Sequence, residues 1–170
     1  VRPALVYENF FQSPETAQYL CNTSWTTKSP QALVFISHGW GEHSARYSEL
    51  GRALQVAGMS AHTLDLQGHG RSTGERHVVQ DMEVFSRNWI EYIQEVVKMN
   101  PAGTPIFLFG HSTGSVIMTR VAQLVDTEFP PLTGLILMSP SMGISPSVNH
   151  FIRALITTIG PYATHLYGGK

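Results

Sequence analysis

The sequence contains a single cysteine, no excess of charge of one sign and no long apolar run. Cys21 has no second cysteine to pair with, so an internal disulfide is excluded, as is usual in a reducing compartment. The formal net charge is −1, which gives no indication of nucleic-acid binding. No stretch reaches the roughly 18 apolar residues that span a bilayer. We therefore expect a cytoplasmic protein that can associate with a membrane surface.

The composition is that of a globular domain, and short apolar runs alternate along it with amphipathic segments. Hydrophobic residues make up 42% of the 170 positions, enough for one compact core. Strands separated by helices call for right-handed crossovers and a mostly parallel sheet, so the fold class is α/β. The expected strands are 32–37, 60–66, 105–109 and 135–138, with an earlier antiparallel strand at 16–24; the expected helices are 46–57, 81–100 and 113–126.

The motif G-x-S-x-G occurs at residues 110–114, directly after one expected strand and directly before a helix. A nucleophilic serine must project from a tight turn between strand and helix, and Gly110 and Gly114 leave room for that turn. The N-terminus of the following helix also places backbone N–H groups and the positive end of the helix dipole beside the serine, where negative charge develops during the reaction. The motif therefore predicts that Ser112 is a catalytic nucleophile.

A second block, HGWGEH at residues 38–43, follows an expected strand about seventy residues earlier. Acyl transfer needs two N–H groups at the oxyanion, and we expect them from Thr113 and from this loop, at Trp40. His38 and Gly39 open the loop as part of the structural motif. A metal site formed by His38, His43 and Asp65 is a remote alternative, because the loop lacks a cysteine pair and helically spaced histidines.

A third block, DLQGHGRSTGERH at residues 65–77, follows another expected strand. An aspartate at a strand end beside a histidine is typical of catalytic acids. Turn-forming glycines surround Asp65, however, and short polar side chains in such loops usually bind backbone groups. We expect Asp65 to have this structural role.

Together these three blocks resemble monoacylglycerol lipases, a group of serine hydrolases also called Hydrolase_4 or S33-like lysophospholipases. The likeness covers about residues 17–141. It implies an α/β-hydrolase fold and hydrolysis of a single-chain glycerolipid ester, with the roles already expected for Ser112, Trp40 and Thr113. The sequence departs from the family pattern at Ser115, where another glycine is usual, and at Trp40, where a smaller residue is common. The larger Trp40 side chain is expected to narrow the entrance for the acyl chain.

The triad acid and base of this fold should follow the nucleophile, each at the end of a later strand. The acids after Ser112 are Asp126 and Glu128; Asp126 would lie about 20 Å away along the helix. Neither His150 nor His165 has the strand and acid partner that a base needs. We therefore expect the triad Asp and His to be absent from this chain, which would be a fragment with about a millionfold lower turnover.

These observations predict two regions: residues 1–143, the N-terminal part of the hydrolase core, and residues 144–170, the start of a cap. An amphipathic helical pattern at 145–160 favours a cap that touches membrane. The expected activity is cleavage of monoacylglycerol or a similar single-chain lipid ester, with no cofactor, no metal and no nucleic-acid partner. Lysophospholipase or other carboxylesterase activity is an alternative. A non-catalytic lipid-binding or interaction module is another.

Overall fold

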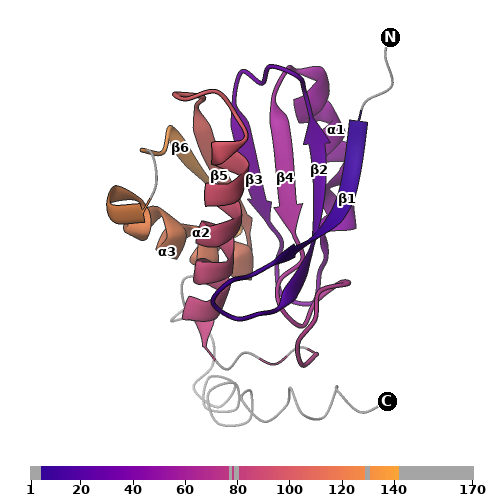
Figure 1. The fold of residues 1–170 in the computed structure, drawn as a ribbon. Coiled ribbons are helices and arrows are strands. Elements are labelled where there is room, and N and C mark those ends of the chain that lie inside the picture. The colour runs from indigo at the N-terminus through magenta and orange to yellow at the C-terminus, as the bar shows by residue number, and fades with distance from the viewer. Residues whose placement is uncertain (1–4, 77, 79–80, 129–130, 142–170) are drawn as a thin grey trace.

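A computed structural model describes residues 5–76, 78, 81–128 and 131–141 of the chain. They form one six-stranded sheet with the strand order β1-β2-β4-β3-β5-β6 (Figure 1). The pairs β4–β3, β3–β5 and β5–β6 are parallel, whereas β1–β2 and β2–β4 are antiparallel. This is the mostly parallel α/β sheet that the sequence predicts.

Three short strands form the middle of the sheet. β3 (Leu33–Ser37) and β5 (Ile106–His111) come from apolar runs, and β4 (Ser60–Leu64) also contains polar residues. Side chains alternate along β3: Leu33 and Phe35 enter one core cluster, and Val34 and Ile36 enter another on the opposite face. Because both faces of β3 are buried, its sequence is continuously apolar.

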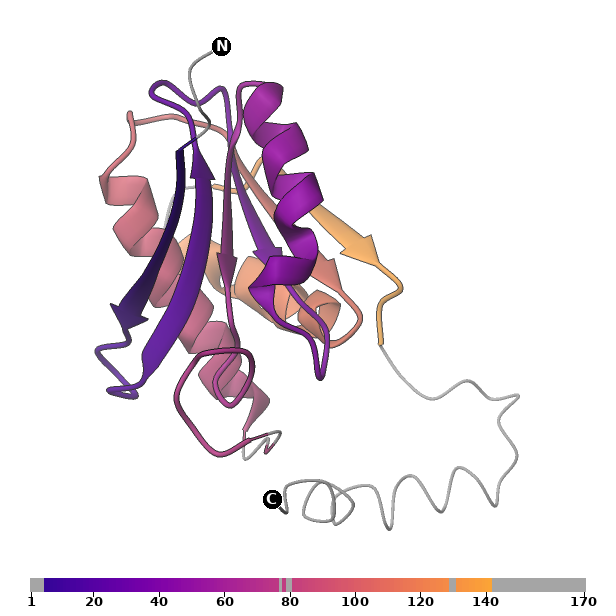
Figure 2. The same cartoon turned by 90° about the vertical axis from the view of Figure 1, so that its right-hand side faces the viewer.

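Helices cover both faces of this sheet. Helix α1 (Ser48–Val56), preceded by the short 3₁₀ helix η1 (Ser44–Tyr47), lies on one face (Figure 2). Helices α2 (Met82–Lys98) and α3 (Thr113–Glu128) pack side by side on the other. Asp81 caps α2 as expected, since its carboxylate accepts the N–H of Glu83 at 2.9 Å. The sheet and the helices on its two faces therefore form three layers, and the loops that follow the strands lie at the ends of the sheet.

The N-terminal hairpin is the part of the fold that the sequence predicted least well. It pairs β1 (Leu5–Gln12) with β2 (Tyr19–Thr26). β2 falls two to three residues later than the expected strand at 16–24, and β1 was not predicted. β1 is an edge strand with half-exposed aromatic residues, Tyr7 and Phe10, so it lacks the continuous apolar run that marks the central strands.

Strand β6 (Gly134–Met138) forms the opposite edge of the sheet. Its four apolar residues, Leu135, Ile136, Leu137 and Met138, are each 36–49% exposed within the described structure. The helix expected at 145–160 and the whole cap region, 144–170, lie outside the described residues. Among the described helices, none is both long and apolar enough to cross a membrane.

Candidate active site

Ser112 occupies a sharp turn between β5 and α3. β5 ends at His111, α3 begins at Thr113, and Ser112 between them has a φ of 51°, in the left-handed region that non-glycine residues rarely adopt. Its N–H donates to the carbonyl oxygen of Met138 at 3.0 Å, which holds the turn against the end of β6. Strained backbone of this kind is characteristic of functional positions.

The glycines of the motif are required by close backbone approach. A Cβ on Gly110 would lie 2.5 Å from the carbonyl oxygen of Gly114, within the turn itself. A Cβ on Gly114 would overlap the carbonyl oxygens of Ser37 and His38 at the end of β3. α3 can therefore start directly against β3 only because both positions lack a side chain.

Ser115, where the family pattern has glycine, is accommodated without a clash. Its hydroxyl is fully buried and donates to the carbonyl oxygen of Gly110 at 2.7 Å. The carbonyl oxygen of Met138 lies 3.2 Å from the same hydroxyl. The extra side chain thus joins the ends of β5 and β6 beneath the turn.

The loop after β3 reaches the same place, as the sequence predicted for the second block. A Cβ on Gly39 would stand 3.1 Å from Cβ of Ser112. His38 is buried; its Nδ1–H donates to the carbonyl oxygen of Gly39 at 2.7 Å, and its Nε2 accepts the N–H of Leu66 at 3.0 Å. Burial lowers the pKa of His38 to about 4, so the ring is neutral at pH 7. His38 therefore connects the loops after β3 and β4.

Glu42 joins that loop to the residue before the nucleophile. Its Oε2 accepts hydrogen bonds from the N–H of Gly39 (3.0 Å), the hydroxyl of Tyr47 (2.9 Å) and Nδ1 of His111 (3.2 Å). Arg46 pairs with the other carboxylate oxygen at 3.1 Å. Burial opposes ionisation of Glu42, but the hydrogen bonds outweigh it and lower the pKa of the carboxyl to about 2.

Sequence reasoning did not assign this role to Glu42. The residue belongs to the HGWGEH block, but its partners Tyr47 and His111 come from η1 and β5. A carboxylate three positions after a loop glycine is the available signal, since such side chains often accept loop N–H groups. Its link to His111, 69 residues away, depends on the fold.

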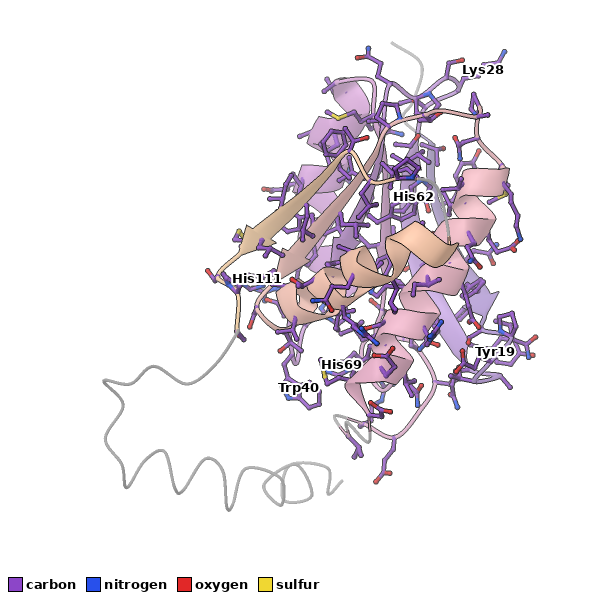
Figure 3. All side chains as sticks on the ribbon, turned by 90° about the vertical axis from the view of Figure 1, so that its left-hand side faces the viewer. Tyr19, Lys28, Trp40, His62, His69 and His111 are labelled. Carbon is purple, nitrogen blue, oxygen red and sulfur yellow. The ribbon has the colours of Figure 1, made fainter. Side chains whose placement is uncertain are left out.

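Trp40 and Thr113 lie on the two segments that flank Ser112, as the oxyanion hypothesis requires. Thr113 is the first residue of α3, and the N–H groups of a first helical turn have no partner within the helix. The Trp40 ring is 36% exposed and meets the ring of His69 edge-on, with centroids 4.8 Å apart. Trp40, His69 and His111 lie at one end of the sheet (Figure 3). The function of the Trp40 and Thr113 N–H groups as oxyanion donors stays a prediction.

Asp65 supports the loops around it. Its Oδ1 accepts the N–H of Ser44 at 2.6 Å, and its Oδ2 accepts the N–H of Arg71 at 2.9 Å. Gly70 packs directly on the carboxylate, leaving no space for a Cβ. These contacts match the structural role expected from the sequence and leave the side chain turned into its own loop.

The hydroxyl of Ser112 has a partner on the β6 side of the site. Its Oγ hydrogen-bonds to Oγ of Ser141 at 3.2 Å. Asp126 lies near the far end of α3, whereas His150 and His165 fall outside the described residues. Within the described part, no three acidic, histidine or cysteine side chains could hold a metal ion together, and both ring nitrogens of His38 are already bound.

The comparisons with known proteins agree with this geometry. The family model described as Hydrolase_4, serine aminopeptidase S33, matches residues 28–169. The monoglyceride lipase of Rattus norvegicus is 40% identical over 139 residues, which are 81% of this chain and 45% of that protein. The chain spans about half the length of the curated relatives it matches.

Solved structures give the same result. The monoacylglycerol lipase of Paleococcus ferrophilus is 30% identical with a TM-score of 0.60, over 83% of this chain and 51% of that one. A thermostable carboxyl esterase from Bacillus coagulans is 25% identical with a TM-score of 0.71, over 95% of this chain and 50% of that one. The six-stranded sheet therefore corresponds to one half of such enzymes.

Proposed function

Because the chain belongs to the Hydrolase_4 family of α/β-hydrolases, we propose that it carries the nucleophile of a serine ester hydrolase of the monoacylglycerol-lipase type. The observation that supports this most directly is the strained backbone of Ser112, held at the junction of β5 and α3. A φ of 51° at a serine is costly, and such strain persists where function requires it.

In the proposed reaction, Oγ of Ser112 attacks the ester carbonyl while a histidine takes its proton. The N–H groups of Thr113 and Trp40 stabilise the oxyanion of the tetrahedral intermediate. The histidine then protonates the leaving alcohol, and an acyl-enzyme ester remains on Ser112. Water, activated by the same histidine, releases the fatty acid and restores Ser112. No metal ion takes part in any of these steps.

The histidine and its acid partner come from outside the described residues. This assignment follows from the surroundings of Ser112, whose hydroxyl has Ser141 as its described partner. His111 precedes Ser112 directly, but its Nδ1 is bound to Glu42 on the loop after β3. The loop after β3 contacts the Ser112 turn on one side. A histidine that acts as base would therefore approach Ser112 from the other side, next to β6.

The proposed substrate is a monoacylglycerol, the ester after which the monoglyceride and monoacylglycerol lipases similar to this chain are named. Trp40 stands on the loop beside Ser112 and presents an exposed indole ring, which would pack against the acyl chain. Lysophospholipids and other carboxylic esters of one acyl chain are the alternatives within the same chemistry. The cap, at residues 144–170, would provide the remaining apolar wall.

The test combines covalent labelling with turnover. Protein isolated from its natural source is treated with a fluorophosphonate and digested, and the modified peptide is identified by mass spectrometry. We expect modification at Ser112 and release of fatty acid from monooleoylglycerol, both lost in Ser112→Ala. Ser48→Ala, which removes a serine hydroxyl that binds only the Ala45 carbonyl, serves as the matched control and should keep both.

Two results would contradict the proposal. Modification elsewhere, with Ser112→Ala still active, would exclude Ser112 as the nucleophile. Binding of monooleoylglycerol vesicles without labelling or turnover would favour the non-catalytic lipid-binding module. Faster hydrolysis of lysophosphatidylcholine than of monooleoylglycerol would keep the nucleophile and change the substrate.

A further inference from the structure

A cavity lies away from Ser112, between the β1–β2 hairpin and the C-terminal half of α2. We refer to it as the hairpin cavity; its volume is about 770 Å³, within the range of small-molecule sites. His62, which lines it, is the middle residue of β4 and lies well apart from Trp40 and His111 (Figure 3). The proposed esterase reaction makes no use of this region.

The floor of the hairpin cavity is polar and comes from the sheet. Asn22, Ser24 and Thr26 alternate along β2 and so share one face, beside His62 on β4. Asn22 is only 9% exposed, and its side-chain amide lines the cavity. The amide offers one acceptor and two donor positions to a ligand in the cavity.

The polar groups next to Asn22 form a buried network that is neutral at pH 7. Oγ of Ser24 lies 3.0 Å from Nδ1 of His62 and 3.3 Å from the hydroxyl of Tyr92, which enters from α2. Burial lowers the pKa of His62 to about 4 and raises the pKa of Tyr92 to about 12. Nε2 of His62 is buried without a partner among the described residues.

Charged groups stand at the rim and are already engaged. Glu91 accepts the Ser13 hydroxyl at 2.6 Å and the N–H of Glu15 at 3.1 Å. Glu95 pairs with Lys98 at 2.9 Å. With two carboxylates and one ammonium group among the residues that line it, the cavity repels an anion such as a phosphate or a fatty-acid carboxylate.

Aromatic rings form the walls. Tyr7, which pairs with Ser24 across the two strands, is 51% exposed and lies on the same face as the polar floor. Phe11 packs against Tyr92 with ring centroids 5.5 Å apart and closes the inner wall. A ligand here would therefore have apolar faces that cover rings and polar edges that reach the amide and hydroxyl groups of the floor.

We propose that the hairpin cavity binds a neutral, polyhydroxylated ring, a mono- or disaccharide. The C–H faces of a sugar ring pack on aromatic side chains, while its hydroxyls act as both donors and acceptors and so match the Asn22 amide and the Thr26 hydroxyl that line the cavity. An acyl chain would leave the polar floor unsatisfied, and an anionic ligand would face the carboxylates at the rim. A neutral sugar meets all three conditions.

The experiment titrates the isotope-labelled full-length protein with D-glucose and with maltose, followed by backbone and side-chain amide NMR. We expect saturable shifts centred on the Asn22 amide and on Thr26, and weaker binding of glucose 6-phosphate than of glucose. Asn22→Leu, similar in volume but unable to hydrogen-bond, should weaken binding at least about tenfold, since two hydrogen bonds are lost.

Two further variants keep the test decisive. Tyr7→Ser changes a half-exposed side chain, so it should weaken binding even if Asn22→Leu destabilises β2. Ser112→Ala should bind both sugars like the unmodified protein, which separates this site from the esterase site. No shift with either neutral sugar, or equal shifts in Tyr7→Ser and the unmodified protein, would overturn the proposal.

Discussion

Ser112 lies between two flanks of very different construction. On one side the loops after β3 and β4, residues 38–47 and 65–72, form what we call the β3 flank. On the other side β6 and residues 139–141 form the β6 flank. Both contact the nucleophile turn: the β3 flank at Gly39, and the β6 flank through the carbonyl oxygen of Met138.

The β3 flank is dense with buried, hydrogen-bonded polar groups. His38 and Asp65 are 1% and 3% exposed, and each binds backbone groups at two points. The β6 flank has the opposite character, because four consecutive apolar residues of β6 are exposed by a third to a half. In the β6 flank, the hydroxyl of Ser141 lies 3.2 Å from Oγ of Ser112.

The difference shows which part of the candidate site is preorganised within the described residues. Networks of satisfied polar groups hold a loop in one position, as an oxyanion site requires. An exposed apolar edge has unused hydrogen-bonding and packing capacity, and accepts a further strand. The β3 flank, which includes Trp40, thus holds its side of the Ser112 turn in one position, whereas the β6 flank leaves an open edge beside that turn.

The largest effect should come from breaking the contact between the start of α3, which follows the Ser112 turn, and the end of β3. Gly114→Ala would force a Cβ onto the carbonyl oxygens at the end of β3 and should destabilise folding by about 3 kcal/mol or more, measured by urea unfolding. Gly41→Ala is the control: its φ is +71° but nothing lies within 4 Å, so only about 1 kcal/mol of backbone strain is expected. Equal losses would refute the steric explanation.

Removing the Asp65 carboxylate should weaken the β3 flank by itself. Asp65→Ala leaves the buried N–H of Ser44 without an acceptor and deprives the N–H of Arg71 of its own, so we expect a loss of about 2–3 kcal/mol in the free energy of unfolding. Asp81→Ala, which removes only the exposed cap of α2, should cost about 1 kcal/mol. If the two variants are equally stable, Asp65 does not organise the loops.

Acid should act on the β3 flank through His38. The folded pKa of His38, about 4, lies below the ordinary value of 6.5, so the unfolded chain binds the proton more readily. Its contribution to stability is therefore complete above pH 6.5 and is lost as the pH falls towards 4. His62, with a folded pKa also about 4, adds a similar loss.

Unfolding curves at pH 7 and pH 5 measure this effect. In His62→Phe, the difference in the free energy of unfolding between pH 7 and pH 5 should be smaller than in the unmodified chain. The remaining difference should come from His38. A stability that is the same at both pH values in the unmodified chain would contradict the assignment of neutral, buried rings. The folded pKa of Glu42, about 2, lies below the ordinary value of 4.5. The contribution of Glu42 to stability is therefore complete above pH 4.5 and is lost as the pH falls from 4.5 towards 2.

The smallest effect on folding is expected at the β6 flank. Ile136→Lys places a charge on an exposed edge position, so the free energy of unfolding should change by less than about 0.5 kcal/mol. Self-association, measured by sedimentation velocity, should decrease because a charged edge disfavours strand pairing. Val56→Lys, at an 87% exposed position on α1, is the control and should not change self-association.

Much of the fold could be predicted because its signals are local. Continuous apolar runs identify β3, which is buried on both faces, and β5, which is buried on one face and partly buried on the other. The nucleophile turn could be predicted for the same reason, because a strand, G-x-S-x-G and a helix follow one another directly. β1 could not, because it is stable through pairing with β2 and not through any periodicity of its own.

The sequence by itself determined the α/β class, the strand–turn–helix unit around Ser112 and the likeness to monoacylglycerol lipases, all of which depend on neighbouring residues. Tertiary structure alone decided which distant groups meet. Glu42 reaches His111 across 69 positions, and the Asn22 amide faces a cavity whose opposite wall is α2. Such contacts depend on strand order and register, and sheet pairing between remote segments leaves no periodic trace in the chain.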